Sequence, residues 1–359
     1  MNLDSLSTDA LFDVACNSVD EDTRWKAISR LHFVGGEDAF QKCLQLLRST
    51  NIKHKIAAVD ILAQLMDPDR IDAADSDGTK YKRLHPRKTI DVLLNVVTSA
   101  SDEDLLASIF YAMGHNKSQR AVSSLVAHKN HFNSDIRYAV CFALLTNTDK
   151  DSIFALIDLS KDEDEDVRNW ATFGLAQQID LNTPYIRNAL WNRVSDRNNE
   201  IRAEAILGLS RRQDKSSIEL IICELHNAIE KGECWDQIIE AAFYMPDPRY
   251  CEYLEILKSK KSDIWFIDEA IAANRIPLVN EYKMPDTAPS TCPVCGLNNA
   301  YSDDDEWQFC RRCGWVLDND QLLNPHLSNR KNIRSLNKEQ RRWLERIEIA
   351  KASIKHNSD

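Results

Sequence analysis

The chain has 359 residues, of which 43% are hydrophobic and 28% charged, as in a folded protein of two domains or of one repeat array with a small module. Only 9 glycines and 10 prolines occur, which argues against a β-sandwich and favours helices. The formal charge is −11, and no apolar run approaches the ~18 residues that a membrane span requires.

The first residues contain no basic region followed by an apolar core, so we expect no signal peptide and a cytoplasmic protein. Residues 321–359 hold nine Lys and Arg against four Asp and Glu, or +5, which leaves −16 for the rest of the chain. An acidic body argues against nucleic acid as the partner and suits a basic protein. The same charge would also keep a protein soluble without any partner, and composition does not decide between these interpretations.

One pattern recurs along the chain: an acidic or Asn-rich turn, an aliphatic residue, an arginine, then small and apolar residues at helical spacing. The first copies are weak and place Arg24 and Lys55 at the arginine position. The next copy places Leu106 there, far enough beyond Lys55 to predict an insertion of about 20 residues between the two copies. We place this insertion at residues 66–86, which are rich in Asp, Pro and Gly.

The clearest copies occupy residues 133–139, 164–171 and 198–205. Their arginines are Arg137, Arg168 and Arg202, so the pattern repeats every 31 to 34 residues. The turn residues can cap the following helix by accepting its free N–H groups. Apolar residues at intervals of three or four predict one buried face on each helix. These predicted core residues are Ile136, Val140, Ala143, Leu144, Val167, Ala171, Leu175, Ile201, Ala205 and Leu209.

Second helices are predicted between the motifs, at residues 151–159 and 217–228, and two degraded copies follow at 235–245 and 264–273. This spacing and pattern resemble HEAT repeats, in which antiparallel helix pairs stack on one another. The resemblance covers residues 4–275 and implies an all-α fold, with a HEAT-like α-solenoid domain over residues 1–275.

In a HEAT stack, the second helix of each repeat lines the concave side. The resemblance therefore makes four residues of that helix the candidates for contact with a partner: Asn169, Trp170, Phe173 and Glu204. Aromatic side chains are common anchors at interfaces. The alternative for Trp170 and Phe173 is packing between repeats.

Residues 276–291 contain three prolines and are interpreted as a linker. Two CxxC pairs follow, Cys292 with Cys295 and Cys310 with Cys313, and residues 296–309 lie between them. Four thiolates at this spacing predict a closed, structural Zn²⁺ site, and the short apolar runs around them predict a hairpin, as in a zinc ribbon over residues 292–318. The alternatives are reduced core thiols or redox chemistry at the CxxC pairs.

Residues 319–359 form a basic tail, in which residues 337–354 predict an amphipathic helix. This helix could pack on the rest of the chain, or it could serve as a basic arm for a nucleic acid or an acidic surface. The other six cysteines fall in helical apolar patterns and are predicted to be small buried hydrophobic residues: Cys16, Cys43, Cys141, Cys223, Cys234 and Cys251.

Catalytic motifs are missing from the sequence: it contains no P-loop, GxSxG, HExxH or GxGxxG. We therefore expect a binding protein without enzymatic activity and without a small-molecule substrate. Zn²⁺ is the only cofactor predicted.

Several stretches look like the HEAT-repeat immunity proteins of Rhs and other polymorphic toxin systems, the YibA type: residues 35–39, 164–171, 199–210, 214–215 and 238–242. This resemblance implies a protein that binds the toxic carboxyl-terminal domain of a polymorphic toxin and blocks its active site. The zinc ribbon and the basic tail depart from that family. The alternatives are a general HEAT-repeat scaffold or adaptor, an enzyme of the bilin-lyase type, and a nucleic-acid binder that uses the ribbon and tail.

Overall fold

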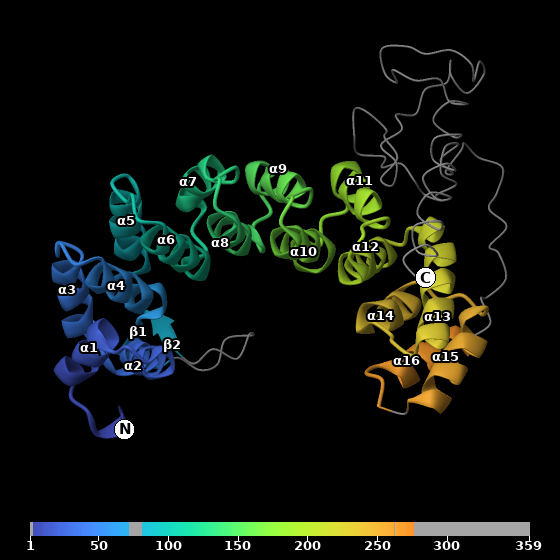
Figure 1. Ribbon diagram of the computed structural model, residues 1–359, viewed down its shortest axis with the longest axis horizontal. Helices are drawn as coiled ribbons and strands as arrows, with labels where there is room; N and C mark the ends of the chain where they lie inside the picture. Colours follow the sequence, from blue (N-terminus) through green and yellow to red (C-terminus); the bar gives the residue numbers. More distant parts are fainter. Residues whose placement is uncertain (1–2, 72–80, 262, 276–359) are drawn as a thin grey trace, which may run out of the picture. The chain divides into compact units, whose positions relative to one another are not determined.

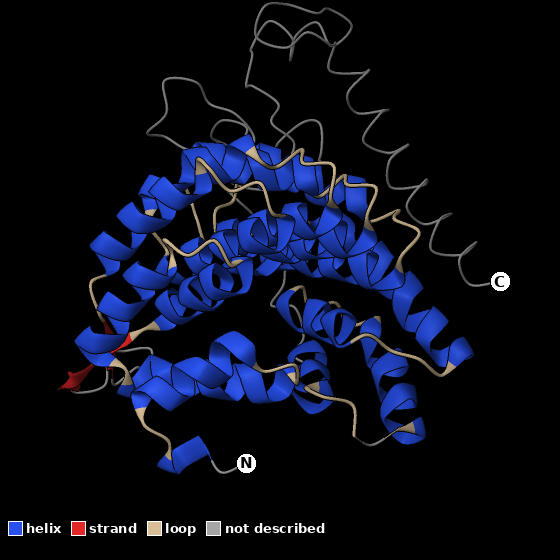
Figure 2. Cartoon of the chain, turned by 60° about the vertical axis from the view of Figure 1, so that its left-hand side comes forward, coloured by secondary structure: helices blue, strands red, loops and turns tan. Residues whose placement is uncertain are grey.

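The computed structural model of the protein describes residues 3–71, 81–261 and 263–275. The backbone separates into two compact units, residues 1–155 and 156–359, and each is described by itself. Sixteen α-helices and one two-stranded sheet occur within the described ranges (Figures 1 and 2). The linker, the zinc-ribbon cysteines and the basic tail all lie outside them.

The first unit contains four helix pairs. Its elements are η1 (Leu3–Ser5), α1 (Thr8–Asn17), α2 (Glu21–Val34), α3 (Gly36–Leu46), α4 (Ile52–Gln64), β1 (Met66–Ile71), β2 (Tyr81–Arg83), α5 (Pro86–Val97), α6 (Glu103–Asn116), η2 (Gln119–Ala121), α7 (Val122–Ala127) and α8 (Ser134–Leu144). Each odd-numbered helix packs on the even-numbered helix that follows it, and α2, α4, α6 and α8 pack on one another in sequence. Helix α9 (Lys150–Leu159) begins in the first unit and ends in the second.

The second unit continues the same pattern. Its elements are α10 (Glu165–Phe173), a π-helical segment η3 (Gly174–Gln178), α11 (Pro184–Arg193), α12 (Asn199–Arg211), η4 (Lys215–Ser217), α13 (Ile218–Lys231), α14 (Asp236–Tyr244), α15 (Tyr250–Lys260) and α16 (Ile267–Arg275). Helices α10, α12, α14 and α16 pack on one another in sequence, and α11, α13 and α15 pair with α12, α14 and α16.

The predicted turn residues are the N-caps of the second helices. In each case the side chain accepts a hydrogen bond from a backbone N–H of the first turn: Asp20, Asn51, Asp102, Asn133, Asp164 and Asn198. Each such cap stabilises its helix by about 1 kcal/mol. The cap prediction is therefore confirmed for the weak copies as well as the clear ones.

The predicted apolar stripes are buried. Val167, Ala171 and Leu175 are fully covered, as are Ile201, Ala205 and Leu209. Burying a Val, Leu or Ile side chain stabilises a fold by about 1.5–3 kcal/mol, so these stripes make the core of the second unit. Of the six other cysteines, Cys16, Cys43 and Cys141 are buried as predicted, whereas Cys223, Cys234 and Cys251 are only partly covered.

Close approach between second helices depends on two glycines. A Cβ on Gly208 would lie 2.8 Å from Ala176 Cα, and a Cβ on Gly114 would lie 2.8 Å from Ala143 Cα. No ordinary side chain tolerates such a distance, so glycine allows α12 to pack directly on the π-helical segment and α6 on α8.

The insertion at residues 66–86 contains an antiparallel hairpin, which the sequence did not predict. Met66 pairs with Arg83 and Ile71 with Tyr81, with an irregular register between them. The guanidinium of Arg83 donates to the carbonyl of Ala63, near the end of α4, and so fixes the base of the hairpin to that helix.

Candidate partner-binding faces

The repeated arginine makes the same contacts in all three clear copies. Its Nη1 donates to the carbonyls six and five residues earlier, in the turn that precedes its helix. The two distances, in that order, are 2.9 and 3.1 Å for Arg137, 2.8 and 3.3 Å for Arg168, and 3.0 and 3.5 Å for Arg202. The side chain therefore holds the turn against the helix. This explains why an arginine accompanies the acidic turn in the repeated pattern.

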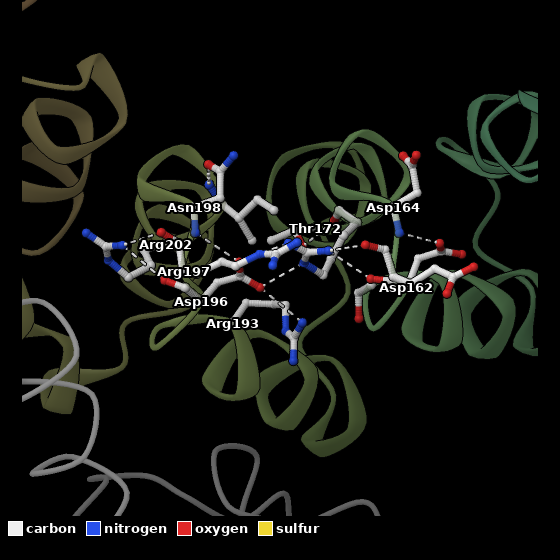
Figure 3. A network of polar contacts seen from close by, with 12 residues as sticks. Asp162, Asp164, Thr172, Arg193, Asp196, Arg197, Asn198 and Arg202 are labelled. Atoms are coloured by element: carbon white, nitrogen blue, oxygen red, sulfur yellow. Dashed lines mark hydrogen bonds and ion pairs between the residues drawn. The ribbon is translucent and has the colours of Figure 1, made fainter. Parts of the chain in front are cut away.

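In the second unit, these arginines also bind buried carboxylates of the next repeat. Arg168 donates from Nε and Nη2 to the two oxygens of Asp196, at 2.9 and 3.3 Å, and Arg202 donates from Nε to Glu224 at 3.2 Å. Arg193 Nη1 adds a second guanidinium at the carboxylate of Asp196 (Figure 3). Such charge-assisted pairs fix the position of one repeat on the next and make a rigid support for the residues on the surface of the second helices.

A further arginine, Arg212, caps the carbonyl end of the π-helical segment η3. Arg212 is only 6% exposed and donates to the carbonyls of five residues: Leu175, Ala176, Ile179, Leu181 and Gly208. Burial lowers the pKa of this guanidinium to about 10, so it remains charged at neutral pH. It satisfies carbonyls at the end of η3 that have no partner within the helix.

Three of the predicted contact residues lie side by side on α10. Trp170 and Phe173 are partly exposed, and their rings meet edge to face with centroids 5.6 Å apart. Asn169 is partly buried, and its Oδ1 atom is covered and accepts no hydrogen bond from any described residue. A covered acceptor without a donor costs about 1–3 kcal/mol, and a partner that drew this amide outward and donated to it would relieve that cost.

The fourth predicted residue, Glu204 on α12, is only 4% exposed. Its carboxylate accepts from Gln177 Nε2 and Gln237 Nε2, each at 2.8 Å, so it connects η3 and α14. Burial raises its pKa, and Glu200 and Glu240 act in the same direction. Glu204 thus lies beneath the surface between α10 and α14, and a partner would meet its two glutamines first. We call the surface formed by Asn169, Trp170, Phe173, Gln177 and Gln237 the α10–α14 face.

The first unit holds a groove that sequence patterns did not reveal. It has a volume of about 810 Å³ and is lined by side chains of α2, α4, α6 and α8, among them Trp25, Asp60, Tyr111 and Phe142. Small residues on α4 and α6 leave the space open. The weak copies of the repeat in this region predicted helices but no hollow between them.

The four predicted zinc ligands, Cys292, Cys295, Cys310 and Cys313, lie outside the described residues. Within residues 3–71, 81–261 and 263–275, no three His, Cys, Asp or Glu side chains are grouped as a metal site. No helix in the same part of the chain has both the length and the apolar character to span a membrane.

The described helices define an α-helical repeat protein. No protein-family profile matches the chain. The chain is 37% identical over 138 residues to Protein YibA of Escherichia coli K12 and, equally, to Protein YibA of E. coli O157:H7. Each match covers 38% of this chain and 48% of the relative, so the chain spans about half the length of the curated relatives it matches.

The fold resembles the X-ray structure of E. coli YibA. The TM-score is 0.58 at 24% sequence identity, over 76% of this chain and 93% of the other. This similarity confirms the all-α, HEAT-like expectation for the described helices, which pack in sequential pairs.

Proposed function

We propose that the protein binds another protein without catalysis, and that this partner is the toxic domain of a polymorphic toxin. The observation that carries the proposal is the α10–α14 face. There an edge-to-face aromatic pair and an amide oxygen without a donor lie on helices braced by buried arginine pairs. A rigid face with partly exposed aromatic anchors suits protein recognition. The resemblance of the repeat motifs to Rhs immunity proteins supports the choice of a toxin domain.

Co-expression with candidate toxin domains from the same organism tests this proposal. We expect the cells to survive and the two proteins to elute as one complex in size-exclusion chromatography. If no complex forms and no protection is seen, the immunity proposal is wrong. A complex with a different protein would favour a general scaffold instead.

The aromatic pair should dominate the affinity for the toxin domain. Replacing Trp170 with alanine is expected to weaken binding by about 2 kcal/mol, or roughly 30-fold, because a buried tryptophan anchor is lost. Titration calorimetry would measure the loss. Tyr185→Ala is the matched control, since this tyrosine on α11 is 63% exposed and lies outside the α10–α14 face. Equal losses in the two variants would exclude the assigned face.

We also propose that the protein acts in the cytoplasm and that Cys292, Cys295, Cys310 and Cys313 together bind one structural Zn²⁺. Metal analysis of the purified full chain should find one zinc per chain, and Cys292→Ser should abolish it, because three thiolates hold zinc far more weakly than four. Cys223→Ser should keep the metal, since this cysteine belongs to helix α13. Zinc that survives Cys292→Ser and Cys310→Ser would show that the pairs are not the ligands.

A further inference from the structure

The groove of the first unit is lined by small residues and by aromatic rings. Ala63 of α4 and Ala107 and Ser108 of α6 are among the residues that line it, and their short side chains leave the space of about 810 Å³ unfilled. A cavity of this size holds one or two side chains of a partner. It belongs wholly to residues 1–155 and is separate from the α10–α14 face.

Aromatic rings from three different helix pairs line the groove. Trp25 on α2 is 45% exposed, with the guanidinium carbon of Arg24 5.1 Å from its ring centroid. Tyr111 of α6 and Phe142 of α8 meet edge to face at 5.3 Å. Ring faces attract cations, and Arg24 already shows this geometry at Trp25.

Carboxylates outnumber cations inside the groove. Asp60, Glu21 and Asp104 line it together with only two basic residues, Arg24 and Lys53. The two histidines that line it, His32 and His115, have pKa values lowered by burial and are therefore neutral at pH 7. The lining thus carries a net charge of −1.

Asp60 is the buried carboxylate of this set. It is 7% exposed, and one of its oxygens lies 2.5 Å from Arg24 Nη2. Arg24 is shared, because its Nη1 also binds Glu21 at 3.1 Å. Burial raises the pKa of Asp60 to about 6 in spite of this arginine. A second cation near Asp60 would therefore be stabilised.

We propose that this groove binds a basic, extended segment of a partner protein, with an arginine or lysine side chain passing Trp25 to reach Asp60. The rings of Trp25 and Tyr111 contact the aliphatic part of that side chain and its charge. The excess of carboxylates gives the charge complementarity. The inference goes beyond the proposed function, since it concerns another unit and holds whether or not the partner is a toxin.

The test uses the full chain and a fluorescein-labelled hexapeptide, Gly-Arg-Leu-Arg-Leu-Gly, in fluorescence anisotropy. A peptide with citrulline in place of arginine removes the charge and keeps the shape. We expect the arginine peptide to bind at least about tenfold more tightly than the citrulline peptide. Asp60→Asn should remove that preference, and Trp25→Ala, at an exposed position, should weaken binding by about fivefold.

Asp38→Asn is the matched control for charge. This exposed residue of α3 lies outside the groove and carries the same charge as Asp60, so its variant should bind like the unaltered protein. Equal affinity for both peptides, or equal losses in Asp38→Asn and Asp60→Asn, would overturn the inference. So would a labelled single-stranded oligonucleotide that binds through Trp25 while the arginine peptide does not bind. If Asp60→Asn fails to fold, the affinity of Trp25→Ala for the arginine peptide tests the proposal instead, and an unchanged affinity would contradict it.

Discussion

Replacing Arg212 with methionine is expected to destabilise the second unit by about 3–5 kcal/mol, because each buried acceptor that loses its donor costs about 1–3 kcal/mol and several carbonyls lose theirs. Methionine fills similar space but donates nothing, so the carbonyls of Leu175, Ala176 and Ile179 would be left buried without hydrogen bonds. The π-helical segment should then fray. Urea unfolding followed by circular dichroism would measure the change.

Two further variants separate hydrogen bonding from charge. Arg212→Lys keeps the charge but has three donors on one nitrogen. The stability of this variant should therefore lie between that of Arg212→Met and that of the unaltered protein. Arg211→Met removes the neighbouring arginine, which is partly exposed and binds Gln177 O and Asp180, and should cost no more than about 1 kcal/mol. If Arg211→Met is as damaging as Arg212→Met, the assigned role of Arg212 is wrong.

The sequence predicted the helices of the repeats well, because caps and apolar spacing are local features. Asp164 caps α10 and Val167 is buried, as the clear copies implied. The sequence pattern did not predict the contacts of Arg168. Only the fold brings the turn carbonyls and the carboxylate of Asp196 to this side chain. The π-helical segment was missed for the same reason, because Arg212 belongs to the end of the following repeat and reaches η3 only in the folded chain.

The hairpin at residues 66–86 was missed because its composition is that of a loop. Among the described residues, strands β1 and β2 pair with each other alone, and Arg83 fixes their base through a contact to α4 that no local pattern encodes. The degraded copies near the end of the second unit were interpreted correctly as helices, since α14 and α16 keep the apolar spacing.

The candidate sites were predicted less completely than the fold. Trp170 and Phe173 lie on a partly exposed surface, where the repeat pattern placed them, and their contact with a partner stays a prediction. The resemblance to a HEAT stack also made Glu204 a contact candidate, but its carboxylate is buried and binds Gln177 and Gln237, which come from other repeats. The groove at Asp60 depends on small residues of separate helices, a property that a single helix pattern does not contain.

Asp60→Asn is expected to gain stability relative to the unaltered protein as the pH rises from about 4 to 7, by up to about 3 kcal/mol. Burial raises the pKa of Asp60 from 3.8 to about 6, so the folded state favours the protonated acid. That contribution to stability is present below pH 3.8 and is lost as the pH rises through about 6, whereas asparagine does not titrate. Urea unfolding of both proteins at several pH values would give the difference.

The sign of this difference tests the physical basis of the groove. Arg24 and a hydrogen bond from Ser108 lower the pKa of Asp60, whereas burial and Glu21 raise it, and burial is the largest of these effects. Because the other titrating groups, including His32 and His115, occur in both proteins, they cancel in the comparison. A difference that fell with rising pH would mean that Arg24 already satisfies the carboxylate, and the groove would then lack the unbalanced charge that attracts a basic segment.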